Sequence, residues 1–314
     1  MGSHVSTAAP TSPGAGLTAE ERWNNIEQFT NEYFQYLCTF GGVVLTVETR
    51  LQVAQMALDA LKCPGCASFS NDACLRKGCH IYETLASLDT HGSASNANEN
   101  VLCQLVHSII NHQGRLTEAW YQTTLEKLDE CGWIDETVAP TESMKRSYLL
   151  YSLFSEIVLV ATMVHSLSSI FLIMGRDMPY LPQESPTATP PSLFDWSLAI
   201  KPGKAPQTMR CWAPFLTASQ VNSKSPPFSG MDPEMKRNHL KYAMTSRGPL
   251  GAANWSLVDV SWALRMQSLL YVEVKDVVAM YRPLSPETRC AQSFSRRDAE
   301  VVATAIAQAY NCAF

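Results

Sequence analysis

The chain has 314 residues, of which 46% are hydrophobic and 17% are charged. This composition excludes a disordered polyelectrolyte, because so much apolar material beside so little charge can form a buried core. The 24 Lys and Arg residues against 29 Asp and Glu residues give a net charge of -5. A protein that binds nucleic acid by itself needs a basic excess for its phosphate contacts. We therefore expect no direct binding to nucleic acid.

The first 17 residues are rich in Gly, Ser, Pro and Ala and contain no hydrophobic run. The segment lacks the apolar stretch of a secretory signal, and we expect it to be disordered. These features favour a protein of the nucleus or cytoplasm that is not secreted. Its 10 Cys are then expected to be reduced thiols.

Two helices are predicted after this segment. The first begins at Thr18, which is followed three residues later by Glu21 in the capping-box arrangement. Its apolar positions recur at helical spacing up to a Gly-Gly break at residues 41–42, and they are Trp23, Ile26, Phe29, Phe34 and Leu37. The second helix is predicted from Val44 to Leu61, with apolar positions at Leu45, Leu51, Ala54, Leu58 and Leu61.

The following part of the chain alternates loops and helices. Residues 62–79 form a cysteine-rich loop, and residues 89–98 have the polar composition of a solvated loop. Periodic apolar positions then run from Val101 to Leu128 and predict one long helix, in which Gly114 marks a kink.

Residues 148–174 are almost continuously apolar, with Glu156 and His165 as the acidic and basic residues among them. The stretch is long enough to cross a membrane. We prefer a buried central helix of a bundle, because these two groups and several serines would be unfavourable in an isolated span within lipid. We therefore expect no membrane partner.

Eleven prolines interrupt residues 177–233, which predicts a long irregular connection. Helical patterns return over residues 233–244, 255–281 and 296–310. The sequence therefore predicts an all-α fold, an irregular multi-helix bundle with a long Pro-rich connection. Its expected parts are the disordered segment 1–17, a helical core 18–175, the connection 176–232, and C-terminal helices packed on the core over residues 233–314.

The densest group of metal-ligating residues lies in the cysteine-rich loop. It has the spacing Cys-x2-Cys-x7-Cys-x4-Cys-His and consists of Cys63, Cys66, Cys74, Cys79 and His80. Four thiolates and an imidazole at short spacing can hold a tetrahedral structural zinc ion. The alternative is that these cysteines are buried and behave as small hydrophobic residues.

A second group of candidate residues lies in and near the predicted long helix. His112-Gln113 followed by Glu118-Ala119-Trp120-Tyr121 is similar to the haem-facing helix of tryptophan-dioxygenase-type enzymes. That similarity implies an α-helical metal- or haem-dependent biosynthetic enzyme that uses His107, His112 and Glu118, with His165 or His239 as a haem ligand. The alternative is that these histidines are satisfied core residues, as a lone His in an apolar helix often is.

Three stretches follow one another in an informative order. The first is Val-Val-Leu-Thr-Val-Glu over residues 43–48, which continues through spaced leucines to Cys63 and Cys66. The second runs over residues 102–110 and on to Ala-Trp-Tyr-Gln at 119–122, and the third is Leu-Arg-Met-Gln-Ser-Leu-Leu at 264–270. In this order they resemble the C-terminal regulatory region of fungal aflatoxin-regulator-type transcription factors.

This resemblance implies a regulatory α-helical domain of a transcription regulator for a secondary-metabolite gene cluster. Its partner would be another protein, a transcription factor or coactivator, bound through helical contacts. Such regulators carry an N-terminal zinc-cluster module for DNA binding, and no such module occurs in these 314 residues. Direct DNA binding is therefore not part of the expectation. The common nucleotide-binding, serine-hydrolase and zinc-protease motifs are also absent from the sequence, which favours a protein that is not an enzyme.

Overall fold

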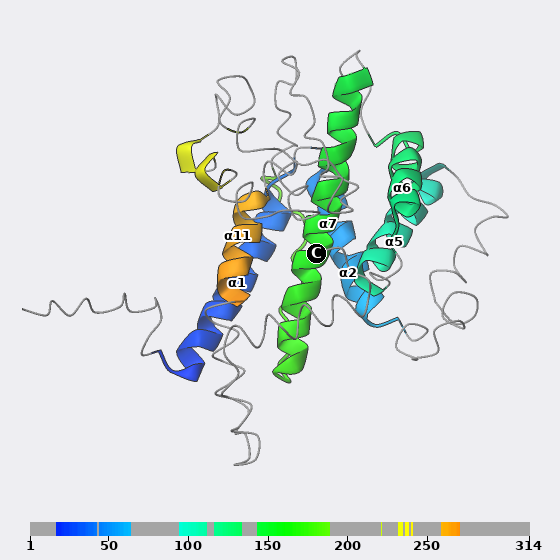
Figure 1. Cartoon of the computed structure of the whole chain (residues 1–314). Helices are drawn as coiled ribbons and strands as arrows, with labels where there is room; N and C mark the ends of the chain where they lie inside the picture. The colour runs from blue at the N-terminus through cyan, green and yellow to red at the C-terminus, as the bar shows by residue number, and fades with distance from the viewer. Residues whose placement is uncertain are drawn as a thin grey trace, which may run out of the picture.

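A computed structural model describes residues 17–42, 44–63, 94–111, 116–133, 143–188, 221, 232–234, 236–238, 240 and 259–270. These residues are 76% helical and contain no strand, which confirms the predicted all-α fold. The long helix α7 (Ser143–Ile173) forms the centre, with α1 (Ala19–Thr39) and α11 (Val260–Leu269) side by side along it (Figure 1). Three further helices pack on α7, and they are α2 (Val47–Leu61), α5 (Ala94–Asn111) and α6 (Glu118–Glu130).

Helix α1 begins with the capping box that the sequence predicts. The Oγ1 atom of Thr18 accepts a hydrogen bond from the Glu21 N–H at 3.2 Å, and Oε2 of Glu21 accepts one from the Thr18 N–H at 2.7 Å. Two N–H groups that would lack partners at a helix start are thereby satisfied. The predicted apolar stripe of this helix is buried, and Trp23 and Leu37 are completely so.

Helix α2 begins three residues later than predicted, at Val47, and the Oγ1 atom of Thr46 accepts a hydrogen bond from the Thr49 N–H. Its buried face also differs from the predicted stripe. The leucines at positions 51, 58 and 61 are half-buried, whereas Arg50 is completely buried. The helix is turned in this way because Arg50 has an ionic partner inside the fold.

The single long helix predicted over residues 101–128 is wrong, because the structure has two helices there. Helix α5 already begins at Ala94, inside the predicted polar loop, and ends at Asn111. Thr117 has an extended backbone (φ -122°, ψ 166°), and its side chain accepts a hydrogen bond from the Trp120 N–H. Thr117 is thus the N-cap of a new helix, α6.

Helix α7 confirms the predicted central helix, because α2, α5, α6 and α11 all pack against it. The part from Leu149 to Leu172 is the one stretch among the described residues that is long and apolar enough to cross a membrane. In the fold, 61% of its apolar window is buried. The helix ends at Ile173, and the positive φ of 63° at Gly175 lets the N–H of Arg176 reach the carbonyl of Phe171 at 3.0 Å.

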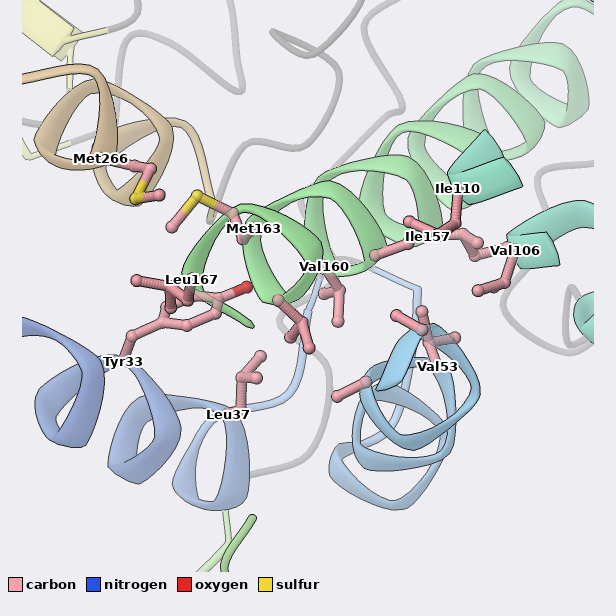
Figure 2. Packing of buried hydrophobic residues seen from close by; sticks show 14 of the residues in the cluster. Tyr33, Leu37, Val53, Val106, Ile110, Ile157, Val160, Met163, Leu167 and Met266 are labelled. Carbon is pink, nitrogen blue, oxygen red and sulfur yellow. The ribbon is translucent and has the colours of Figure 1, made fainter. Parts of the chain in front are cut away.

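The hydrophobic core surrounds the middle of α7. Figure 2 shows Tyr33 and Leu37 of α1 and Val53 of α2 pointing toward α7. Met266 approaches from α11 beside Met163 of α7. Side chains from segments more than 200 residues apart in the chain therefore share one core.

Several predictions lie wholly or mostly outside the described residues. These are the disordered segment 1–17, the helix over residues 296–310, most of the connection 176–232, and most of the helix predicted over 255–281. Half of the helix predicted over 233–244 is described, and its described residues, 233–234, 236–238 and 240, are helical. The described start of the connection, residues 176–185, has no regular secondary structure. It passes the end of α1, where the Ser185 N–H donates to the carbonyl of Cys38 at 2.9 Å.

Candidate functional site

The most unusual feature of the interior is a buried ion pair between Arg50 and Asp259. Arg50 lies in the first turn of α2, and Asp259 directly precedes α11. The guanidinium donates two hydrogen bonds to the carboxylate, from Nη2 to Oδ1 at 2.6 Å and from Nη1 to Oδ2 at 3.0 Å. Exposure of the two side chains is 0% and 3%. This bidentate geometry is the strongest form of a charge-assisted contact between Arg and a carboxylate.

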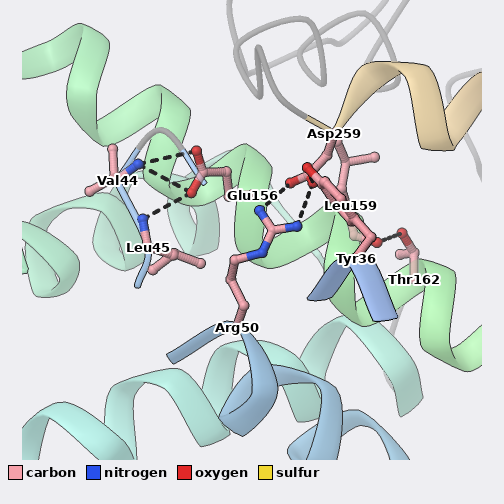
Figure 3. Close-up of polar contacts among 8 residues, drawn as sticks. All are labelled: Tyr36, Val44, Leu45, Arg50, Glu156, Leu159, Thr162 and Asp259. Carbon is pink, nitrogen blue, oxygen red and sulfur yellow. Dashed lines mark hydrogen bonds and ion pairs between the residues drawn. The ribbon is translucent and has the colours of Figure 1, made fainter. Parts of the chain in front are cut away.

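A second carboxylate, that of Glu156, lies on the other side of the guanidinium (Figure 3). It accepts hydrogen bonds from the backbone N–H groups of Val44, at 3.2 and 3.3 Å, and Leu45, at 3.0 Å. These two residues form the turn between α1 and α2, so a side chain of α7 holds the connection between the first two helices. Glu156 is itself completely buried.

The turn comes this close because residue 42 is Gly. A Cβ atom at Gly42 would lie 2.2 Å from Oε2 of Glu156 and 3.0 Å from Nη1 of Arg50. Neither approach is compatible with ordinary van der Waals contact, and the nearest atom belongs to a buried carboxylate rather than to a flexible exposed side chain. The Gly-Gly pair therefore does more than end α1, because it lets the backbone lie against the charged groups.

Two tyrosines of α1 complete this buried ionic cluster, which consists of Arg50, Asp259, Glu156, Tyr36 and Tyr33. The Tyr36 hydroxyl donates a hydrogen bond to Oδ1 of Asp259 at 2.9 Å. Burial and the nearby Asp259 carboxylate raise the pKa of both phenols well above their ordinary value. Burial is the largest effect on the Arg50 guanidinium and would lower its pKa, but the attractions of Asp259, Tyr36 and Glu156 together outweigh burial and raise that pKa.

These shifts indicate what the cluster can do chemically. The guanidinium stays charged and both phenols stay protonated across the physiological range. Arg50 and Glu156 are completely buried and Asp259 is 2% exposed, so a substrate would have to open the core to reach them. Separating the two partners of a buried ion pair leaves an uncompensated charge in the core, so the pair disfavours arrangements of the helices that part Arg50 from Asp259. The cluster is therefore suited to holding α1, α2, α7 and α11 in register.

An open groove lies at the surface next to this cluster, between α1 and α11. We call it the aromatic groove, because its lining includes the rings of Tyr36, Phe40 and Trp262. The Tyr36 ring stacks on Phe40 at a centroid distance of 5.6 Å and lies 5.1 Å from Trp262. Arg265 lies 4.2 Å from the Trp262 ring centre and forms an ion pair with Glu32 at 2.5 Å. Tyr36 connects the groove to the buried cluster through its hydroxyl.

The predicted metal residues fall mostly outside the described part of the chain. Cys63 is buried just after α2, whereas Cys66, Cys74, Cys79 and His80 are not described. Among the described residues, no three side chains of His, Cys, Asp or Glu converge as metal ligands would. The zinc site over residues 63–80 remains a prediction.

The histidines considered for an enzyme are distributed over the molecule. His107 is buried in α5, and His165 is half-buried in α7, where burial lowers the pKa of its imidazole. Glu118 lies exposed in the first turn of α6. His112 and His239 lie outside the described residues. In the described part of the chain, His107, His165 and Glu118 do not form a shared site with metal-ligating geometry.

Sequence reasoning did not identify Arg50, Asp259 or Tyr36 as site residues. A signal was present for one member of the cluster, because Glu156 stands in an otherwise apolar helix and a buried carboxylate needs donors. Its donors proved to be backbone N–H groups more than 100 positions earlier in the chain. Helical periodicity describes neighbours within a few turns, so it could not reveal that pairing.

Comparison of the chain with protein families, with characterised proteins and with solved structures found no match in any of the three. The resemblance to aflatoxin-regulator-type factors therefore stays a prediction that rests on the three stretches themselves.

Proposed function

We propose that this chain is a regulatory, partner-binding α-helical domain of a transcription regulator for a fungal secondary-metabolite gene cluster. It acts in the nucleus through another protein, a transcription factor or coactivator that supplies the DNA-binding module. In this proposal its own role is not catalytic. The role of the helices is to present a fixed surface to that partner.

One observation carries the proposal. The three stretches that resemble the regulators map to α2, to α5 and α6, and to α11, and every one of these helices packs against α7. Arg50 lies within the first stretch, and Asp259 lies five residues before the third. Their ion pair holds the two stretches together in the interior. Motifs far apart in the chain are thus parts of a single folded unit, as expected if the family pattern describes one domain.

The chemistry of the cluster supports the same role. Its guanidinium and phenols retain their protons near neutral pH, and its charged groups are sealed from solvent. Acid–base catalysis needs a group that exchanges a proton near the working pH and within reach of a substrate. The cluster instead resembles a structural network that selects one packing of the helices.

Deleting the coding sequence and measuring transcripts tests the proposal in cells. We expect the coordinated loss of transcripts from one biosynthetic gene cluster. The tagged chain should co-purify with a protein that carries a DNA-binding module. In an electrophoretic mobility assay, it should retard promoter DNA only when that protein is present. Unchanged cluster transcripts together with no such partner would contradict the proposal.

The alternative is an α-helical metal- or haem-dependent enzyme, and the purified chain distinguishes it directly. A stoichiometric Soret band or bound iron would refute the regulatory proposal in favour of the enzyme. One zinc ion per chain, whose removal unfolds the protein, would instead identify a structural site at the cysteine-rich loop.

A further inference from the structure

The connection that leaves α7 is attached to α1 at two places, and we call its residues 176–188 the strap. Near the start of the strap, the Arg176 guanidinium lies 4.5 Å from the ring centre of Trp23, in the N-terminal part of α1. Near its end, the Ser185 N–H donates to the carbonyl of Cys38 in the last turn of α1 at 2.9 Å. The strap therefore spans α1 from its first turns to its last.

The strap ends in a turn that presents a serine followed by a proline. The Ala188 N–H donates to the carbonyl of Ser185 at 2.9 Å, and Pro186 and Thr187 form the exposed corner between them. The Oγ atom of Ser185 accepts a hydrogen bond from the Thr187 N–H at 3.3 Å, in an exposed contact. Protein kinases of the proline-directed class phosphorylate a Ser or Thr that directly precedes Pro. Because residues 176–185 have no regular secondary structure, such a kinase can bind them in extended form without unfolding a helix.

A phosphate on Ser185 would lie at the negative end of α1. The last turn of this helix contains no basic residue, and its final carbonyl groups give that end a partial negative charge. The Ser185 backbone contacts one of these carbonyl groups, that of Cys38, and Glu184 adds a carboxylate next to it in the chain. A phosphoserine carries a charge of about -1.5 to -2 at neutral pH, and beside a helix C-terminus it disrupts packing by like-charge repulsion.

We propose that Ser185 is a phosphorylation site for a proline-directed protein kinase, and that its phosphorylation releases the strap from the C-terminal end of α1. The Oγ atom of Ser185 attacks the γ-phosphorus of ATP and forms the new phosphorus–oxygen bond. The bond from that phosphorus to the bridging oxygen breaks, ADP leaves with the electron pair, and the hydroxyl proton passes to the kinase. The site goes beyond the proposed function, because every group in it belongs to the fold and none to a partner that regulates transcription.

Treatment of the full-length chain with a purified proline-directed kinase and Mg-ATP tests the site, with phosphopeptides mapped by mass spectrometry. Four other Ser or Thr residues precede Pro and are replaced by Ala in the parent protein, and they are Ser12, Thr189, Ser225 and Ser285. We expect stoichiometric phosphate at Ser185. Pro186→Ala keeps the hydroxyl and should lose most of the phosphorylation, and Ser185→Ala should lose all of it.

Alkylation of Cys38 in the native protein measures release of the strap. Cys38 is 2% exposed, so its thiol reacts through local opening at a rate that follows the population of the open form. Repulsion at the helix end should raise this rate about threefold or more in the phosphorylated protein. Cys63, buried after α2, is the internal control and should react at an unchanged rate.

Three outcomes would overturn the inference. They are the absence of phosphate at Ser185, an unchanged or slower alkylation of Cys38 after phosphorylation, and an equal acceleration of Cys38 and Cys63, which would indicate global unfolding. Slower alkylation would mean that the phosphate bonds to the Thr187 N–H and tightens the turn.

The urea midpoint of each variant shows whether it is folded, and the Pro186→Ala arm remains informative if Ser185→Ala is unstable. The proposed function fails separately. Unchanged transcripts after deletion would leave the phosphorylation of Ser185 and the alkylation of Cys38 in the purified protein as they are.

Discussion

Replacing Asp259 with Asn removes the charge that compensates Arg50 and keeps the shape of the side chain. The guanidinium is 0% exposed and loses a carboxylate bonded at 2.6 and 3.0 Å. Breaking a buried ion pair by changing one partner costs about 3–5 kcal/mol. Glu156 remains nearby as a second carboxylate. We therefore expect Asp259→Asn to lower the free energy of unfolding by about 3 kcal/mol, the lower end of this range. This is roughly a hundredfold in the unfolding equilibrium.

The opposite replacement should be more damaging. Arg50→Met removes the one positive charge of the cluster and leaves the carboxylates of Asp259 and Glu156 buried without it. We expect a loss of about 5 kcal/mol, the upper end of the range for a broken buried pair. In the double variant the two losses should not add, because each single change already breaks the same interaction.

Urea denaturation followed by far-UV circular dichroism measures these free energies of unfolding. Asp129→Asn is the control, because Asp129 also pairs with an arginine at 2.6 Å but the two side chains are 37% and 34% exposed. Asp129→Asn should lower the free energy of unfolding by less than about 1 kcal/mol. The reasoning is refuted if Asp259→Asn is as mild as this control, or if Arg50→Met is less damaging than Asp259→Asn.

Three further predictions concern the same helices. Gly42→Ala should destabilise the fold by about 2–4 kcal/mol, because its methyl group would meet Glu156 at 2.2 Å, and an unchanged urea midpoint would contradict this. Because burial raises the pKa of Tyr33, the unfolded chain loses that proton first above pH about 10. The ionisation of Tyr33 in the unfolded chain should then lower the free energy of unfolding by about 1.4 kcal/mol per pH unit. Tyr33→Phe should remove that part of the slope between pH 10 and 11, and an identical slope would refute it. Burial lowers the pKa of His165 below its ordinary 6.5, so below that pH the unfolded chain binds a proton that the folded chain does not. The stability that the neutral His165 contributes is therefore present above pH 6.5 and is lost as the pH falls. His165→Leu should therefore flatten the decline in stability between pH 7 and 5, and a variant that keeps the full decline would contradict the reasoning.

The sequence predicted the helices well wherever a local signal marked them. The capping box at Thr18 located the start of α1, and the apolar run around Glu156 located the central helix. The boundary between α5 and α6 was missed because apolar positions continue at helical spacing on both sides of it. Thr117 carried the information, since its side chain satisfies the first N–H groups of α6. Capping residues deserve as much weight as periodicity.

The candidate site was harder to predict because its contacts are not local. In the sequence, Arg50 looks like an ordinary charged residue on the polar face of an amphipathic helix. It is buried because it pairs with the carboxylate of Asp259, 209 positions away. Likewise, the aromatic groove joins Tyr36 to Trp262, residues that no periodic pattern connects. Charge and ring type are visible in a sequence, but the packing of two distant helices decides which of them meet.

The same sequence distance affects how the protein gains and loses its structure. Closing a loop of 209 residues costs about 5 kcal/mol of chain entropy, so the Arg50–Asp259 contact is expected to form late, after the nearby helices have collapsed. Interactions absent from the folding transition state govern the unfolding rate. Loss of Asp259 should thus leave refolding almost as fast as before and shorten the lifetime of the folded molecule. The ion pair would then mainly slow unfolding, and its main effect would be on how long the folded protein persists in the cell.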